Sequence, residues 1–181
     1  MRTGPRHCQH CGAVLVALTF EDGRTREQCE RCGEIAWRNP APVGMALIEH
    51  EGRLVLIRRL ADPLAGYWAP PAGYVELGES VPQAVLREAR EETGLFIALD
   101  GLFEVYSRAD VSVMIVAYRA HSIGGVLAAG DDAIDTGLFA PDEWPQQPPP
   151  ASGAAMDEWF YGVIHDATSR WRPAVRKETT S

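Results

Sequence analysis

The sequence lacks the features of a membrane or secreted protein. It has no apolar run of about 18 residues, the length that a membrane-spanning helix needs, and it does not open with the basic, apolar and small-residue pattern of a secretory signal. It also lacks a basic excess, since its net charge is −8 at pH 7 and its pI is about 5.1. Such a chain cannot neutralise phosphates over a whole face, which argues against a general nucleic-acid surface. We therefore expect a cytoplasmic protein without a membrane partner, which meets anionic substrates locally.

Cysteine is absent from all but the first part of the chain. The four cysteines form two CxxC pairs, Cys8 with Cys11 and Cys29 with Cys32. The segment between the pairs predicts a hairpin, with a strand at residues 14–20 and a turn at residues 21–23. Paired knuckles of this spacing place four thiolates at tetrahedral corners, which is typical of a closed structural zinc site. Two disulfides are the main alternative, but the lack of a secretory signal argues against them, and a redox pair would not need a duplicate.

The zinc ribbon, predicted at residues 1–38, is too small to bury a core of its own. The metal must therefore supply its folding energy, and a closed ligand shell leaves no position for a catalytic water. His7 and His10 flank the first pair, and we expect them on the surface because four sulfurs already fill the shell. With 181 residues, 46% of them hydrophobic, the chain has room for one further domain at residues 39–173. A polar, frayed tail is expected at residues 174–181.

The stretch from Gly73 to Leu95 concentrates five carboxylates. It predicts a helix over residues 81–93, because a capping box can begin that helix and Gly94 can end it. At about 100° per residue, one face of the helix carries three acids, namely Glu88, Glu91 and Glu92. Like charges at this spacing repel one another, so the cluster indicates a cation that prefers oxygen ligands, such as magnesium or manganese. A solvated acidic face paired with Arg87 and Arg90 is the alternative.

The whole stretch resembles the box of the Nudix hydrolase family, G-x5-E-x7-R-E-U-x-E-E-x-G-U, in which U is a bulky aliphatic residue. Every charged position and every glycine of the pattern is matched, and the one departure is Ala89 at the first U. Ala89 is apolar but small, so it weakens a packing contact rather than the metal site. The resemblance implies an α+β fold, namely an α/β/α sandwich with a mixed sheet. It also implies hydrolysis of a nucleoside diphosphate linked to another moiety.

The resemblance further implies which groups hold the catalytic metal. Glu88 and Glu92 are the first expected ligands, because an i,i+4 pair points the same way, and Glu91 is the expected third. Gly73 could offer its backbone carbonyl. Two or three divalent ions bound by these groups would neutralise the diphosphate oxygens and deliver a water in line with the scissile bond.

Arg87 and two acids outside the helix complete the expected catalytic set. Arg87 is placed to orient Glu91 or Glu79 by ion pairing, and Glu79 is placed to brace the loop. Ribbon-bearing relatives carry an E-x-x-E pair before their last strand, and Asp132 and Asp135 have that spacing here. Aspartate is one methylene shorter, and a turn-forming acidic cluster explains the pair equally well. The candidates for the general base are Glu88, Glu91, Asp132 and Asp135.

The residues just before the box resemble the G-x-W-x-x-P-x-G segment that introduces it in many family members. The matching positions are Gly66, Trp68, Pro71 and Gly73. In such proteins this loop lines the site, so Trp68 could stack on a base, and Tyr74 is the second candidate substrate-binding residue. The alternative for Trp68 is a half-buried packing role.

The rest of the chain predicts the other elements of the sandwich. Short apolar segments at residues 43–49 and 53–58, around a turn, predict a hairpin, and β-branched and aromatic enrichment predicts strands at residues 102–108 and 111–120. The short apolar segment at residues 137–139 corresponds to the last strand. Loops or linkers are predicted at residues 61–66, 124–130 and 141–150. Apolar residues at three- and four-residue spacing from Met156 to Trp171 predict the second outer helix, with His165 beside the apolar stripe.

A zinc ribbon ahead of a Nudix domain resembles two groups, the NADH pyrophosphatases and a set of shorter hydrolases that act on ADP-ribose or FAD. The former carry an S-Q-P-W-P-F-P segment after the box, and this sequence has none. This absence lowers NADH and NAD-capped RNA as preferred substrates without excluding them. We expect ADP-ribose or a dinucleotide such as FAD or NADH as substrate. One alternative is a nucleotide-sensing regulatory protein whose ribbon contacts a partner or nucleic acid, which the intact box carboxylates argue against. Another is a nucleoside triphosphatase, which the ribbon argues against. The resemblance is also compatible with a homodimer.

Overall fold

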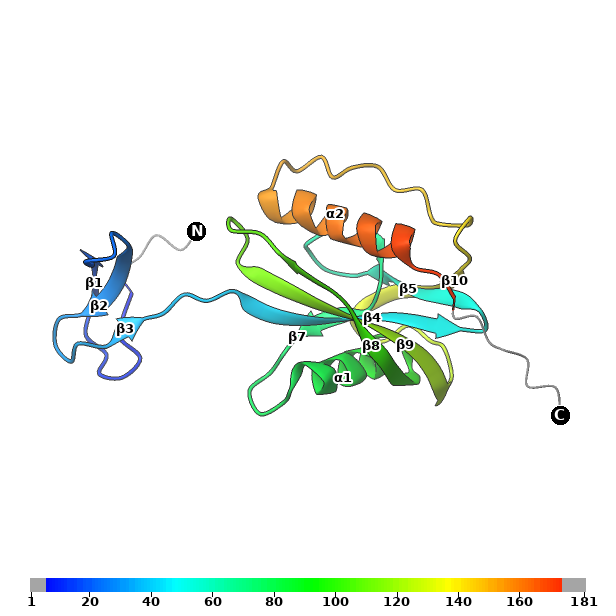
Figure 1. Cartoon of the computed structure of the whole chain (residues 1–181), viewed down its shortest axis with the longest axis horizontal. Coiled ribbons are helices and arrows are strands. Elements are labelled where there is room, and N and C mark those ends of the chain that lie inside the picture. The colour runs from blue at the N-terminus through cyan, green and yellow to red at the C-terminus, as the bar shows by residue number, and fades with distance from the viewer. Residues whose placement is uncertain (1–5, 174–181) are drawn as a thin grey trace. The chain divides into compact units, whose positions relative to one another are not determined.

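The chain forms two compact units that meet between Asn39 and Pro40 (Figure 1). The computed structural model describes residues 6–173, so the tail expected at residues 174–181 lies outside the described part of the chain. Within residues 6–173, no helix is both long enough and apolar enough to cross a membrane.

The first unit is a small antiparallel sheet. Its three strands lie in the order β1-β2-β3, with β1 at Leu15–Thr19, β2 at Thr25–Cys29 and β3 at Ile35–Ala36. The predicted hairpin is therefore present, and its turn contains Gly23 at φ +75°. Among residues 6–39, the buried side chains are those of Cys8 and Cys29. The unit has almost no apolar interior, as predicted for a ribbon that depends on a metal.

The second unit is a mixed sheet of seven strands. Five of them lie in the order β10-β5-β4-β9-β8, namely Ala133–Phe139, Arg53–Arg59, Ala41–His50, Val113–Gly125 and Leu95–Ser107. Two short strands add to this path, since β6 (Trp68–Ala69) pairs with β5 and β7 (Ala72–Tyr74) pairs with β4. The β4 and β9 strands run parallel, and the other pairings are antiparallel.

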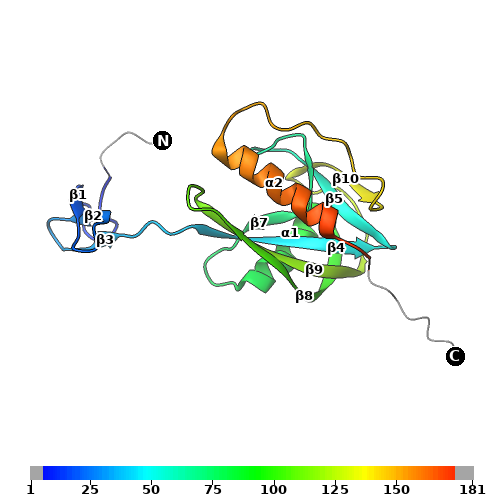
Figure 2. The same cartoon turned by 45° about the horizontal axis from the view of Figure 1, so that its top comes forward.

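One helix covers each face of this sheet, α1 (Val81–Thr93) on one side and α2 (Ala155–Arg170) on the other (Figures 1 and 2). This arrangement confirms the predicted α/β/α sandwich. The predicted bounds of α1 are confirmed to the residue, because the signals that set them are local. Ser80 and Gln83 form the capping box, and Gly94 adopts the left-handed conformation at φ 72°.

α1 packs closely on the middle of the sheet. Its buried residues include Val85 and Ala89, which join a core cluster with Ala46 and Ile48 of β4. The approach depends on Gly44 of β4, because a Cβ there would lie 2.7 Å from Val85 Cγ2. This close contact places α1 directly on β4. Because β7 pairs with β4, it also sets the distance between α1 and β7.

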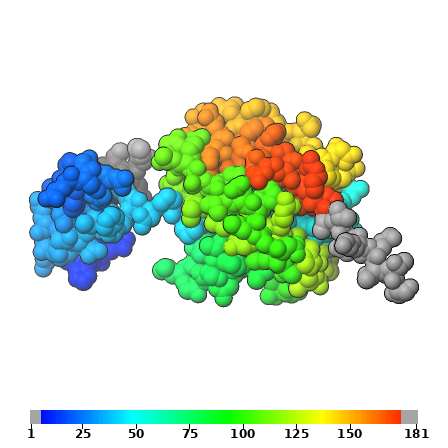
Figure 3. All heavy atoms as spheres, in the orientation of Figure 1, coloured from blue at the N-terminus to red at the C-terminus, as the bar shows by residue number. Residues whose placement is uncertain are grey.

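α2 covers the opposite face with an aromatic stripe, as its spacing predicted. Trp159, Phe160, Val163 and Ile164 are buried against Met45 of β4 and residues of β9. Figure 3 shows the surface of α2 in orange and red lying directly against the green surface of β8 and β9. The Tyr106 hydroxyl also donates a hydrogen bond of 2.7 Å to Asp166 of α2, which fixes the position of the helix along the sheet.

The structure departs from the sequence prediction in several places, and one of them is β10, which begins at Ala133 rather than at residue 137. β8 begins at Leu95, directly after α1, and β9 continues to Gly125, so both strands are longer than predicted. The extra residues pair with each other, Leu95 with Gly125 for example, and a pairing between distant segments leaves no local signal. In the predicted linker at residues 141–150, Gln147 is tied to β6. The Trp68 N–H donates to Gln147 Oε1, and Gln147 Nε2 donates to Trp68 O at 2.9 Å.

Candidate functional site

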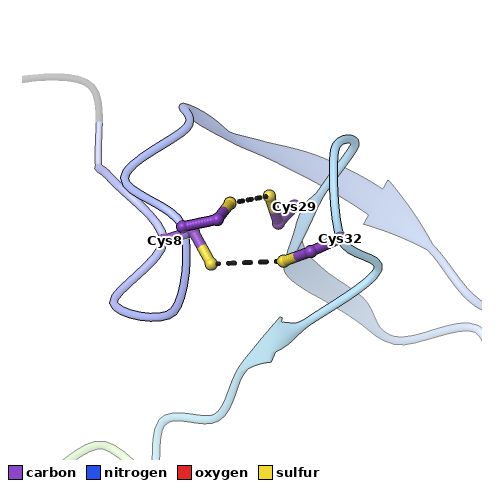
Figure 4. Close-up of side chains that lie close together, drawn as sticks. Cys8, Cys29 and Cys32 are labelled. Carbon is purple, nitrogen blue, oxygen red and sulfur yellow. Dashed lines mark hydrogen bonds between the residues drawn. The ribbon is translucent and has the colours of Figure 1, made fainter.

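The four cysteines of the first unit converge on one point. Their sulfur atoms all lie within 4.8 Å of one another, and Figure 4 shows the sulfurs of Cys8, Cys29 and Cys32 turned towards a common centre. The Sγ atoms of Cys8 and Cys32 are 3.6 Å apart, and those of Cys11 and Cys29 are 3.4 Å apart. Four sulfurs at about 2.3 Å from one tetrahedral ion would be about 3.8 Å apart, so the cluster could hold such an ion. His7 and His10 are exposed and stand outside it, as expected.

In the second unit, the acidic face of α1 meets the loop that leads out of β7. Gly73 in β7 lies so close to Glu88 that a Cβ at position 73 would be 2.0 Å from Glu88 Oε1. A Cβ there would displace the Glu88 carboxylate from this position, whereas the bare backbone of glycine makes room for it. The same approach leaves the Gly73 backbone beside the carboxylate oxygens, in a set of hard oxygen donors that suits magnesium or manganese.

Arg87 ties the acids around the start of the helix together. Its guanidinium donates to Glu79 at 2.7 and 3.1 Å, to Glu88 at 2.7 Å and to Glu91 at 3.0 Å. It also donates to the backbone oxygen of Tyr74 at 3.0 Å. The bond from Arg87 holds the pKa of Glu79 below its ordinary value. The contacts predicted for Arg87 with Glu79 and Glu91 are thus both present.

Glu92 is the buried member of the acidic face. Its side chain is 5% exposed, and its Oε2 accepts a hydrogen bond of 2.8 Å from the backbone N–H of Ala72. Burial raises the pKa of Glu92 to about 8, against the hydrogen bond from Ala72, and the charge on Glu88 raises it further. Burial also raises the pKa of Glu88, against the pull of Arg87. A bound cation would remove this penalty by stabilising the ionised carboxylates.

In residues 6–173, the cysteine cluster is the one group of three or more ligand-type side chains close enough to share an ion as the side chains stand. Glu88 and Glu91 turn towards Arg87, whereas Glu92 turns towards Ala72 of β7. Rotation of Glu88 away from Arg87 would bring it towards Glu92, one helical turn further along the same face. The donor set and the space beside Gly73 therefore fit a divalent ion after a small side-chain movement.

A cavity of about 390 Å³ opens beside this face, within the size range of small-molecule sites. The structure brings five of the predicted site residues together around it: Gly73, Tyr74, Glu88, Glu92 and Asp132. Glu91 is exposed and does not line it.

Two further predicted residues lie away from the cavity. Asp135 is exposed on β10, where its Oδ1 accepts a hydrogen bond from the Thr136 N–H. Trp68 packs edge-on against Phe139, with ring centroids 5.1 Å apart, and it borders the core cluster around Trp171. This geometry matches the packing role that was the alternative for Trp68.

The cavity also has residues that the sequence did not single out. Arg59, at the end of β5, lines it together with Met156, Trp159 and Phe160 of α2. Burial lowers the pKa of Arg59, and its Nε donates to the backbone oxygen of Pro63 at 2.8 Å. The stripe of α2 was predicted as core. The spacing of the stripe could not reveal that one end of it borders a cavity, because the cavity is completed by residues of β4 and β9, which are distant in the sequence.

Comparisons with known proteins agree with this geometry. The NUDIX domain model matches residues 38–167. An ADP-ribose pyrophosphatase from Methanocaldococcus jannaschii is 40% identical over 105 residues, which cover 56% of this chain and 62% of that protein. An NAD-capped RNA hydrolase NudC from Pseudomonas aeruginosa is 29% identical over 144 residues, which cover 79% of this chain and 51% of that protein. The chain thus spans about half to two thirds of the length of these relatives.

Solved structures extend the match to nearly the whole chain. The crystal structure of a NUDIX hydrolase from Nitrosomonas europaea has a TM-score of 0.79 at 27% identity, and the match covers 94% of this chain and 96% of that one. The crystal structure of a MutT NUDIX hydrolase from Burkholderia pseudomallei has a TM-score of 0.56 at 31% identity, with 72% of this chain and 96% of that one covered.

Proposed function

Because the chain belongs to the Nudix family, we propose that it is a metal-dependent hydrolase that cleaves a nucleoside diphosphate linked to another moiety. One observation carries the proposal: the cavity beside α1 is lined by Glu88, Glu92 and Gly73 together, with Glu92 buried. A buried carboxylate next to a second one is unstable without a cation, and a diphosphate needs a cation at its oxygens to be attacked by water.

Glu88 and Glu92 are the proposed ligands of magnesium or manganese, with Glu91 as a third from the rim and the Gly73 carbonyl as a fourth oxygen. The ion supplies charge neutralisation at the phosphate oxygens and an activated water when it is bound. Arg87 holds Glu79 and the loop in place and thereby keeps Gly73 beside the helix. Arg59 lines the cavity, and the N–H groups that its bonds to Pro63 and Ala61 leave over can bind a phosphate oxygen.

Asp132 is the proposed general base. It lines the cavity, and no ion pair with Arg87 occupies its carboxylate. In this role an oxygen of Asp132 accepts the proton of the attacking water. Glu88 is the runner-up, since it also lines the cavity but is the first expected ligand. Asp135 and Glu91 lie outside the cavity lining, which disfavours both.

ADP-ribose is the proposed preferred substrate class, followed by dinucleotides such as FAD and NADH. The relative from Methanocaldococcus jannaschii is named for ADP-ribose, and the missing S-Q-P-W-P-F-P segment separates the chain from the NADH pyrophosphatase pattern. Relatives named NAD-capped RNA hydrolase match at lower identity, so NADH belongs in every assay.

Zinc is the proposed ion of the cysteine cluster, and residues 1–38 and 39–173 are the proposed domains. Four thiolates and no oxygen donor favour zinc over magnesium. The role of this zinc is structural, because the unit around it buries little besides Cys8 and Cys29. The cytoplasmic location and the homodimer stay predictions of the sequence.

The test is release of mononucleotides from ADP-ribose, NADH, FAD and nucleoside triphosphates, with magnesium or manganese. The controls are buffer without divalent ions and the Glu92→Gln variant, matched by Glu158→Gln, which changes an exposed acid on the other helix. We expect metal-dependent cleavage by the natural protein and by Glu158→Gln, and none by Glu92→Gln. If folded, zinc-loaded protein cleaves nothing in the panel, the nucleotide-sensing alternative replaces the enzyme.

A further inference from the structure

The cavity beside α1 has a second end that carries no acids. This apolar end has two walls. The sheet supplies Val43 of β4 with Val113 and Ile115 of β9, and α2 supplies Met156, Trp159 and Phe160. Phe160 and Val113 are buried, and Trp159 is 9% exposed, so their positions are set by the core. The walls are thus rigid surfaces that exist before any ligand arrives.

Arg59 marks the border between the two ends. Its guanidinium carbon lies 5.1 Å from the centre of the Phe160 ring. The negative charges of Glu92 and Asp132 also act on the guanidinium. Among the described residues that line the cavity, Arg59 is the one cation. A phosphate held between the metal end and Arg59 therefore has its organic substituent beside the apolar end.

Among the side chains of the apolar end, the indole N–H of Trp159 is the one strong hydrogen-bonding group. No asparagine, glutamine, serine, threonine or histidine side chain is found among the described residues that line the cavity, and Tyr74 offers the one hydroxyl from a side chain that is 60% exposed. The backbones of Val43 and Ile115 face each other in the β4–β9 ladder, so sheet pairing already uses their polar groups. The backbone oxygens of Ala61 and Pro63 accept from Arg59.

We propose that this end binds a flat ring of the substrate by shape and stacking, without distinguishing one base from another, and that Met156 and Trp159 form the wall that contacts the ring. The inference rests on the proposed function. It narrows the substrate class of that hydrolase to diphosphates that carry an aromatic ring on the substituent next to the cleaved bond. An apolar pocket separates similar groups by about 10–200-fold, whereas a site built on hydrogen bonds separates them by about 10⁴-fold or more.

The test uses symmetric dinucleoside 5′,5′-diphosphates, because both substituents are then the same and the direction of binding does not matter. The compounds carry adenosine, guanosine, uridine or cytidine on both sides, and a fifth compound carries two riboses without bases. We expect kcat/KM to vary by less than about 100-fold among the four dinucleotides. We expect the compound without bases to fall below the slowest dinucleotide by about tenfold or more, since a stacked base contributes about 1–3 kcal/mol.

A variant of the apolar wall connects this pattern to the residues. Met156 is partly buried, so Met156→Ala removes a wall contact with little damage to the core. We expect it to lower kcat/KM for the four dinucleotides by about tenfold and to leave the compound without bases unchanged. Leu102→Ala is the matched control, since Leu102 is apolar, 58% exposed and outside the cavity. Binding of AMP and of ribose 5-phosphate, measured by quenching of tryptophan fluorescence, gives a readout that does not need turnover.

The outcomes separate the inference from the function on which it rests. Equal cleavage of the compound without bases, or a preference for one base above about 10³-fold, overturns the inference and leaves the hydrolase standing. An equal loss in Met156→Ala for compounds with and without bases overturns the assignment of Met156. No cleavage of any compound overturns the proposed function. If AMP in that case binds no better than ribose 5-phosphate, the ring site is overturned too.

Discussion

Replacing Glu92 by glutamine should make the metal-free protein more stable at high pH while it removes activity. The pKa of Glu92 is raised in the folded state from 4.5 to about 8, because the side chain is buried beside Glu88. A carboxyl group with a raised pKa favours the fold while it is protonated. Its contribution is complete below pH 4.5 and is lost as the pH rises to about 8. Glutamine cannot ionise, and its side-chain oxygen can still accept from Ala72.

The size of this effect follows from the pKa values. A rise from 4.5 to about 8 corresponds to at most about 5 kcal/mol once the pH exceeds both values. Relaxation of the cavity and entry of water reduce this cost. We therefore expect the free energy of unfolding of Glu92→Gln to exceed that of the natural protein by about 2–5 kcal/mol at pH 9. Near pH 4 the two proteins should be equally stable, since Glu92 is then protonated in both states.

The assay is urea unfolding between pH 4 and 9, followed by the fluorescence of the tryptophans in the second unit. The buffers contain no magnesium and no chelator, so that the cysteine cluster keeps its metal. Glu158→Gln is the control and should follow the natural protein at every pH. Added magnesium should stabilise the natural protein at pH 9 and have little effect on Glu92→Gln. Parallel pH curves for Glu92→Gln and the natural protein would refute the reasoning, because Glu92 would then not be the buried titrating group.

Three further changes test other parts of the molecule. Cys29→Ser should abolish zinc binding and open the first unit to proteases while the thermal transition of the second unit is unchanged, because the first unit buries little besides its cysteines. Gly73→Ala should lower kcat by about 100-fold or more, since its Cβ would displace the Glu88 carboxylate; Gly162→Ala on α2, where a Cβ meets nothing within 4 Å, should keep full activity. Asp132→Asn should lower kcat by about 100-fold or more, whereas the same change at Asp135 should have little effect, because Asp135 lies outside the cavity.

The fold could be predicted where its signals are local. The helix over residues 81–93 is confirmed to the residue because a capping box and a left-handed Gly94 lie next to its ends. The start of β8 at Leu95 was missed for the opposite reason. Its first residues pair with the end of β9, which lies about 25 residues further along the chain, and its hydrophobic pattern is broken by three shifts of register.

The candidate site divides in the same way. Most of the acidic half of the cavity comes from one stretch of sequence, because β7 and α1 supply Gly73, Glu88 and Glu92, whereas Asp132 comes from further along the chain. The other half is assembled from β4, β5, β9 and α2; β4 and β5 follow each other along the chain, whereas β9 and α2 come much later. Arg59 and Met156 are almost a hundred residues apart, yet both line one cavity.

This division has a chemical reason. In the proposed function the box residues act on the diphosphate, which is the same in every substrate of this kind, so one compact motif can serve them all. The substituent on the diphosphate differs from substrate to substrate, and the site that we propose for it uses side chains such as Met156 and Trp159, which also pack the core of the second unit. Their identities are constrained by packing as well as by the ligand, so apolar stripes of this kind look alike in sequence whether or not they border a cavity. The reaction class can therefore be inferred from the motif, whereas the substrate must be inferred from the three-dimensional position of the ordinary apolar residues on α2 and β9.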